Sequence, residues 1–169
     1  SDEGRLRLSA TNLELGITCW IPARIDHQSL HVQGGSSNND IKCIDAQEFP
    51  PLPVPDMDGA VQINVGDFRE MIHQVAFAAS TDEARPVLMG VLIQVEKEKL
   101  TMAAADGFRL SVRKAVLAAP VPAPVSAIVP AQALKELARV AGDGEEPIYM
   151  VLPKGRGQVI FRVQDVEVV

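Results

Sequence analysis

The chain has 169 residues, of which 47% are hydrophobic, 22% charged and 4% aromatic, and its formal net charge is −6. This composition is typical of a soluble globular protein, and the length suffices for one ordinary domain or two small ones. It excludes a protein that coats nucleic acid through overall positive charge, but not one with a local basic face. No apolar run reaches the ~20 residues of a membrane span, and the first residues lack a secretory signal, so a cytoplasmic protein is expected.

The first third of the sequence carries the alternation of β-strands. Residues 5–19 alternate for most of their length, which predicts one strand, or two strands that meet at Thr11-Asn12. Residues 29–33 and 41–45 predict a hairpin around a polar loop at 34–40.

Prolines then mark a boundary. Residues 49–59, FPPLPVPDMDG, hold four prolines in eleven residues, which predicts an extended linker between domains. A helix is predicted over 66–80, with Asp67 as its N-cap. Its core-facing stripe, at helical spacing, consists of Phe68, Ile72, Val75 and Ala79.

The remainder is rich in β-structure. Residues 86–117 predict strands with a turn near Glu96–Lys99, and a strand at 126–130 leads into a helix at 131–142. Pro130 suits the first turn of that helix and Gly142 its end. Segments 147–153 and 158–163 predict a hairpin, and VEVV begins one more strand. Antiparallel strands with two inserted helices indicate an α+β fold.

Metal, cofactor and catalytic signatures are missing from the sequence. Cys19 and Cys43 have no CxxC spacing, and their alternating surroundings favour buried free thiols over a disulfide or a metal site. His27, His31 and His73 stand in no HExxH or comparable context, and no GxSxG or phosphate-loop motif occurs. We therefore expect no enzyme, no metal and no cofactor.

An internal repeat relates the two halves. GRLRLSATNLELGI (4–17) and EKLTMAAADGFRLSV (98–112) align at an offset of 106 − 12 = 94 residues. The next strand follows Asn12 by 17 residues but Asp106 by 51, so the first copy is shorter by 51 − 17 = 34 residues. We therefore expect an incomplete first domain without its helices.

The motifs that carry a family resemblance lie in this repeat. ARPVLMGVLIQVEKEKLTMAAADGFRLSV (84–112) resembles the second domain of bacterial DNA polymerase III beta subunits, the sliding clamps. GRLRLSATNLELGI and DAQEFPPLP (45–53) resemble segments of their first domain. The resemblance implies a partial first clamp domain at 1–48, a linker at 49–59 and a second clamp domain at 60–169 whose last strand is truncated, with the third domain absent.

The resemblance also implies the architecture and the partners. Clamp domains repeat with antiparallel sheets outside and two helices per domain lining a pore, and a homodimeric ring of full-length subunits encircles duplex DNA without reading its sequence. Such a ring is a non-catalytic processivity factor in the cytoplasm, associated with the nucleoid. It tethers the replicative DNA polymerase, the clamp loader and repair proteins through short linear motifs.

By motif match, the chain would carry half of the peptide-binding pocket. Gly107 would let the ligand approach the backbone, and Leu88 would come from a neighbouring strand. Phe108 and Ala105 replace residues that are polar in many relatives, which predicts a more apolar pocket. The expected pocket residues are Leu88, Ala105, Gly107, Phe108, Arg109 and Leu110. The alternative is a β-bulge with Arg109 pointing outward and Phe108 in the core.

The DNA-facing candidates are polar residues of the two helices and one loop residue. They are Arg69, His73, Gln74, Arg85, Lys135 and Arg139. Basic side chains lining a pore would contact phosphates without sequence readout. The alternative for each is an ordinary solvated helix face. A further alternative for the whole chain is a clamp-fold module that binds peptides without forming a ring.

Overall fold

The structure is a computed structural model that describes residues 5–11, 16–22, 29–34, 37–42, 57–142, 146–153 and 157–169. Its elements, in chain order, are β1 (Arg5–Thr11), β2 (Gly16–Pro22), β3 (Ser29–Gly34), β4 (Ser37–Lys42), β5 (Val61–Ile63), α1 (Val65–Val75), η2 (Ala76–Ala78), η3 (Pro86–Met89), β6 (Gly90–Glu96), β7 (Lys99–Ala105), β8 (Leu110–Val116), β9 (Val125–Pro130), α2 (Ala131–Ala141), β10 (Ile148–Val151), β11 (Ile160–Val163) and β12 (Val166–Val168). The linker predicted at 49–59 lies mostly outside the described residues, as do Cys43 and His27.

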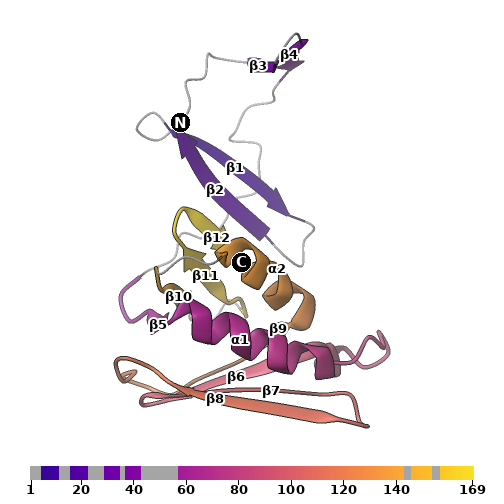
Figure 1. Cartoon of the computed structure of the whole chain (residues 1–169), viewed down its shortest axis with the longest axis vertical. Helices are drawn as coiled ribbons and strands as arrows, with labels where there is room; N and C mark the ends of the chain where they lie inside the picture. Colours follow the sequence, from indigo (N-terminus) through magenta and orange to yellow (C-terminus); the bar gives the residue numbers. More distant parts are fainter. Residues whose placement is uncertain are drawn as a thin grey trace.

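Every strand pairing in the described part is antiparallel, which confirms the predicted α+β class. One sheet has the order β1-β2-β12-β11-β10-β5, a second has the order β8-β7-β6-β9, and β3 pairs with β4. Figure 1 shows α1 between the four-stranded sheet and the strands β10 to β12, with α2 beside it. Both helices therefore cover one face of the four-stranded sheet and leave its other face outward.

The core lies between the helices and the sheets. Phe68, Ile72, Val75 and Ala79, the predicted stripe, are all buried, but only the first three lie in α1. The helix predicted over 66–80 ends at Val75, a 3₁₀ turn follows at Ala76–Ala78, and Ala79 is extended. The Phe68 ring meets the Phe161 ring of β11 at a centroid distance of 5.8 Å, so α1 also packs against the six-stranded sheet. Leu134 and Leu137 of α2 are fully buried in the same cluster.

The start of α1 differs from the prediction. Asn64, not Asp67, is the N-cap: its side-chain oxygen accepts a hydrogen bond from the Asp67 backbone N–H at 3.0 Å. Asp67 instead lies in the first turn, where its negative charge complements the positive end of the helix dipole. Asparagine and aspartate are equally good N-cap residues, so the residue types alone do not choose between Asn64 and Asp67, and the sequence pattern misplaced the cap by one turn.

Three further predictions need correction. β4 begins at Ser37, so most of the predicted 34–40 loop is strand. Leu88 lies in the 3₁₀ helix η3 rather than in a strand, because Pro86 at its start fixes a helical φ. Cys19 is a free thiol, as predicted, but it is half-buried rather than buried.

The repeat is visible in the strands. Adding 94 to the bounds of β1 (5–11) and β2 (16–22) gives 99–105 and 110–116, the bounds of β7 and β8. The registers also agree, since Leu8↔Cys19 corresponds to Met102↔Arg113. The two hairpins differ in what lies beside their second strand. β2 pairs with β12, and next to this pairing Gly16 and Val169 exchange backbone hydrogen bonds of 2.8 and 2.7 Å. The corresponding strand β8 is an edge strand.

A polar row crosses the six-stranded sheet. Successive cross-strand partners along it are Ser9, Thr18, Glu167, Arg162, Tyr149 and Gln62. Glu167 is 9% exposed, and its pKa lies above the ordinary 4.5 because burial disfavours the charged carboxylate more than Arg162 and Arg7 favour it.

Glu167→Gln is expected to raise the free energy of unfolding near pH 7. The raised pKa means that the stability associated with Glu167 is present below the pKa of the unfolded chain and is lost as the pH rises through the folded-state pKa. The gain should therefore vanish near pH 4. Urea unfolding at both pH values checks this, with the exposed Glu96→Gln on β6 as the control. An equal effect of both substitutions would contradict the assignment to burial.

Candidate functional site

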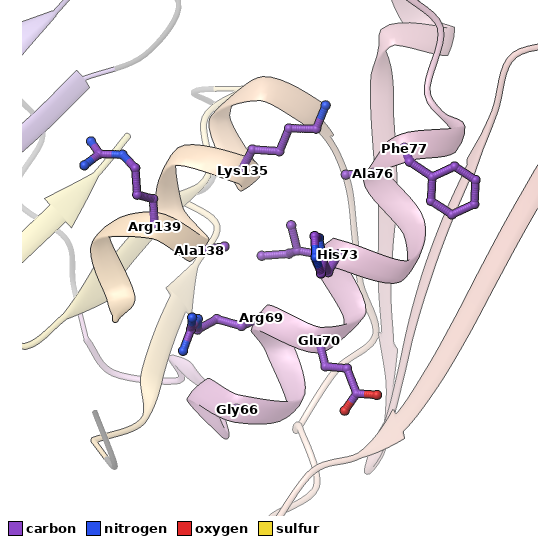
Figure 2. A pocket seen from close by; sticks show the side chains of 10 residues that line it. Gly66, Arg69, Glu70, His73, Ala76, Phe77, Lys135, Ala138 and Arg139 are labelled. Atoms are coloured by element: carbon purple, nitrogen blue, oxygen red, sulfur yellow. The ribbon is translucent and has the colours of Figure 1, made fainter. Parts of the chain in front are cut away.

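Two surfaces bring the predicted site residues together, and the first is a groove of about 690 Å³ between α1 and α2. Four of the six DNA-facing candidates line it. Figure 2 shows Arg69 and His73 on α1 and Lys135 and Arg139 on α2. The helices were predicted separately, and their packing creates the shared groove.

The charged side chains of this groove differ in how they interact with neighbouring residues. Arg139 is held by Glu136, with Nε 2.8 Å from a carboxylate oxygen, although its side chain is 72% exposed. Lys135 is exposed and makes no ion pair with another described residue. Glu70, also at the groove, accepts a hydrogen bond from the Gln74 amide at 2.7 Å. The groove is therefore cationic, with its acidic side chains engaged by neighbours.

The other two DNA-facing candidates lie elsewhere. Gln74 is on α1 but does not line the groove; its backbone oxygen accepts the Ser111 hydroxyl of β8 at 2.6 Å. Arg85 pairs with Asp82 at 2.9 Å in the loop before η3. A Cβ at Gly107 would lie 3.6 Å from the Arg85 guanidinium, so Arg85 borders the β7–β8 turn instead of the groove.

The second surface is an apolar cavity of about 190 Å³ at the outer face of the four-stranded sheet. Leu88, Ala105 and Leu110 line it, as the motif match predicts. Further lining residues that the sequence reasoning missed are Val87, Gly90, Leu92, Ala103, Ala104 and Ile128. Gly90 keeps the cavity open, since a Cβ there would lie 2.3 Å from the Ile128 Cγ2 atom.

The turn that contains Asp106 and Gly107 joins β7 to β8 between the cavity residues Ala105 and Leu110, and Gly107 itself does not line the cavity. The Asp106 carboxylate accepts hydrogen bonds from the backbone N–H of Phe108 at 3.0 Å and of Arg109 at 3.1 Å. The Phe108 bond is the largest cause that holds the Asp106 pKa below its ordinary 3.8, and Arg109 contributes. Gly107 takes φ 94°, a left-handed conformation that costs glycine little. A hydrogen-bonded turn, rather than a strand bulge, presents the motif.

Phe108 and Arg109 do not line the cavity. Phe108 is 95% exposed, so the interpretation that it lies in the core is wrong, whereas its assignment to the peptide site stays a prediction. Arg109 binds Asp106 at 2.9 Å and stacks on Phe77, 5.6 Å from the ring centroid. Phe77 also lines the α1–α2 groove, so Arg109 reaches toward the helices. A lone phenylalanine beyond a helix gives no sequence signal for such a contact.

The described ranges contain neither a candidate metal site nor a candidate membrane-spanning helix. No group of three or more His, Cys, Asp or Glu side chains there could hold a metal ion. No helix within those ranges is long and apolar enough to span a membrane.

Comparison with known proteins bears on the fold and the family. Residues 62–169 match the family model for the DNA polymerase III beta subunit, central domain. Over 135 residues, the chain is 33% identical to the beta sliding clamp of Bacillus subtilis (strain 168) and 36% identical to that of Staphylococcus aureus (strain Mu50 / ATCC 700699). Each match covers 80% of this chain and 35% of the relative, so the chain corresponds to a minor part of those proteins.

Solved structures share the fold. The Bacillus subtilis DNA polymerase sliding clamp superposes with a TM-score of 0.86 at 23% identity, over 99% of this chain and 53% of that one. The beta subunit from DNA polymerase of Streptococcus pyogenes gives 0.86 at 20% identity, over 99% and 53%. The predicted clamp fold is thereby confirmed. The family model covers more than half of the chain, and the chain therefore belongs to the DNA polymerase III beta subunit family.

Proposed function

We propose that this chain serves as part of a processivity clamp that encircles duplex DNA as a dimeric ring and tethers the replicative polymerase, the clamp loader and repair proteins. In this proposal residues 1–48 and 60–169 belong to two clamp domains joined by the linker at 49–59. The protein acts without catalysis, by topological linkage. The observation that carries the proposal is the cationic groove between α1 and α2, in a chain of the clamp family.

The groove suits loose contact with DNA. Arg69, Lys135 and Arg139 supply positive charge from two helices, and His73 adds a donor. Such contacts bind phosphates without selecting sequence, and their strength falls as salt rises. The net charge of −6 opposes tight binding over the whole surface, which favours sliding over a fixed complex.

The experiment for ring function is retention on DNA. The protein at its native length is loaded onto nicked circular DNA by a clamp loader, and the circle is then cut once. A ring stays on the closed circle and is lost from the linear molecule. Equal loss from both forms would favour the ring-less peptide-binding module instead.

Leu110→Ala is expected to weaken peptide binding by about 5-fold or more, because truncating an energetically important contact residue costs above ~1 kcal/mol. Arg109→Ala is expected to weaken binding indirectly, by loosening the turn that adjoins the cavity. Leu110 lines the cavity, and Arg109 holds the adjoining turn. The measurement is fluorescence anisotropy of a labelled peptide with leucine and phenylalanine anchors.

Val116→Ala is the matched control for these variants. Val116 is exposed on the same strand but lies outside the cavity, so its truncation should leave the affinity unchanged. Urea unfolding verifies that each variant is folded. Wild-type affinity in both the Leu110 and the Arg109 variants would exclude this cavity as the peptide site.

A further inference from the structure

The outer face of the four-stranded sheet continues the apolar cavity. Leu92 pairs with Ile128 on one side and with Ala103 on the other, and Ala103 pairs with Val112. These four residues form one row across all four strands. Ile128 is 53% exposed and Val112 48% exposed, although both are apolar.

The row and the cavity form one surface. Leu92, Ala103 and Ile128 belong to both, whereas Val112 lies beyond the cavity edge. Strand alternation puts Leu110, Val112 and Lys114 on the same face of β8. On the opposite face, Ser111 bonds to α1 and Ala115 packs against the core, which fixes this orientation.

The next row is polar and ends in a positive charge. Gln94 pairs with Ser126 and with Thr101, and Thr101 pairs with Lys114. Lys114 is exposed and has no ion pair within the described part of the chain. Lys99 in the following row differs, because it stands directly opposite Glu96. The face therefore changes from apolar at the cavity to cationic at Lys114.

The spacing of this surface matches an extended peptide. Residues i and i+2 of a strand lie about 7 Å apart on one face, and the same holds for alternate residues of an extended ligand. Leu110, Val112 and Lys114 thus present two apolar positions and one cationic position at the repeat of an extended chain.

We propose that a peptide bound in the cavity continues over the outer face of the sheet, with the pattern apolar–x–apolar–x–acidic, and that its carboxylate pairs with Lys114. The first apolar side chain occupies the cavity, the second covers Val112 and Ala103, and the acid meets the lysine. The proposal rests on the proposed function of the cavity as a peptide site. It adds a second subsite and a charge requirement for the ligand.

The test compares labelled peptides containing Leu-Ser-Leu-Ser-Glu with the same peptides ending in Gln. The reversed order, Glu-Ser-Leu-Ser-Leu with its Gln counterpart, is included because an extended ligand can lie in either direction. For the orientation that binds more tightly, we expect the Glu form to bind about 2- to 5-fold better than the Gln form at low salt, the range of an exposed ion pair. The difference should shrink as salt rises.

Substitutions of two lysines test whether Lys114 is responsible for the preference for the Glu peptide. Lys114→Ala should abolish the preference for Glu, and Lys114→Glu should invert it. Lys99→Ala removes the same charge from a lysine opposite Glu96 and should leave the preference intact. A Glu preference that survives Lys114→Ala, or no preference in either orientation, would overturn the proposal.

Leu110→Ala distinguishes a failure of the second subsite from a failure of the cavity as a peptide site. If Leu110→Ala weakens all the peptides but Lys114 has no influence, the cavity binds peptides and the second subsite is refuted. If Leu110→Ala changes no affinity, the cavity itself is not the peptide site, and both proposals fail. Sedimentation of each variant excludes self-association across this sheet face as the cause of an altered signal.

Discussion

Lys135→Glu combined with Arg139→Glu is expected to weaken the affinity for duplex DNA about 30-fold at ~0.15 M salt, if each residue neutralises one phosphate. The two side chains lie one helical turn apart on α2 and face the same groove. Each lost phosphate contact should also reduce the slope of log K against log salt by about 0.9, so the double variant should lose about 1.8. Anisotropy of a short labelled duplex over a range of salt measures both quantities.

A matched charge reversal controls for net charge. Lys99→Glu with Lys114→Glu makes the same change on the outer sheet face, away from the helices. It should alter DNA binding only slightly, through the overall field of the protein. An equal decrease in both double variants would mean that the groove has no specific role in contacting DNA.

Phe68→Ala is expected to lower the free energy of unfolding by about 3–5 kcal/mol, the usual cost of truncating a fully buried phenylalanine. The ring is 0% exposed and packs against Phe161, so its loss leaves a cavity and removes an aromatic pair. The change would loosen α1 from the six-stranded sheet. Urea unfolding of the 169-residue chain measures the effect.

Phe77→Ala is the control for this substitution. Phe77 follows α1 in η2, but its side chain is 55% exposed and contacts the Arg109 guanidinium. We expect a loss of no more than about 1 kcal/mol, because an exposed cation–π contact is weak. Similar losses for both variants would show that the packing of Phe68 is not what anchors the helix.

Periodicity predicted the parts of this fold that depend on local pattern. Phe68, Ile72 and Val75 lie at helical spacing in α1 and are buried, because an amphipathic helix has one face to bury. Gly142 marks the end of α2 and is its C-cap. The turn near Glu96–Lys99 separates β6 from β7, with Lys97 at φ 53°. These features require no knowledge of distant contacts.

The positions of the site residues follow from tertiary packing, which local sequence patterns do not reveal, and only the family motif points to some of them. Gly90 and Ile128 line the cavity only because β6 and β9 pair, and no local pattern reveals that pairing. The motif alone predicts Phe108 at the pocket, whereas in the structure the Asp106 turn directs its side chain into solvent. The shared groove of Arg69 and Lys135 likewise arises from the packing of two helices that are distant in sequence.

The pairing of β2 with β12 has a consequence for biosynthesis. Ile17 and Val168 are partners although 168 − 17 = 151 residues separate them. At a synthesis rate of ~5–20 residues per second, the β2 edge waits roughly 8 to 30 s before its partner strand has been made. An isolated two-stranded hairpin is marginally stable, and an open strand edge invites pairing with other chains. During this interval the β2 edge is open to misassembly, which makes the β1–β2 hairpin a segment that a ribosome-associated chaperone would usefully shield.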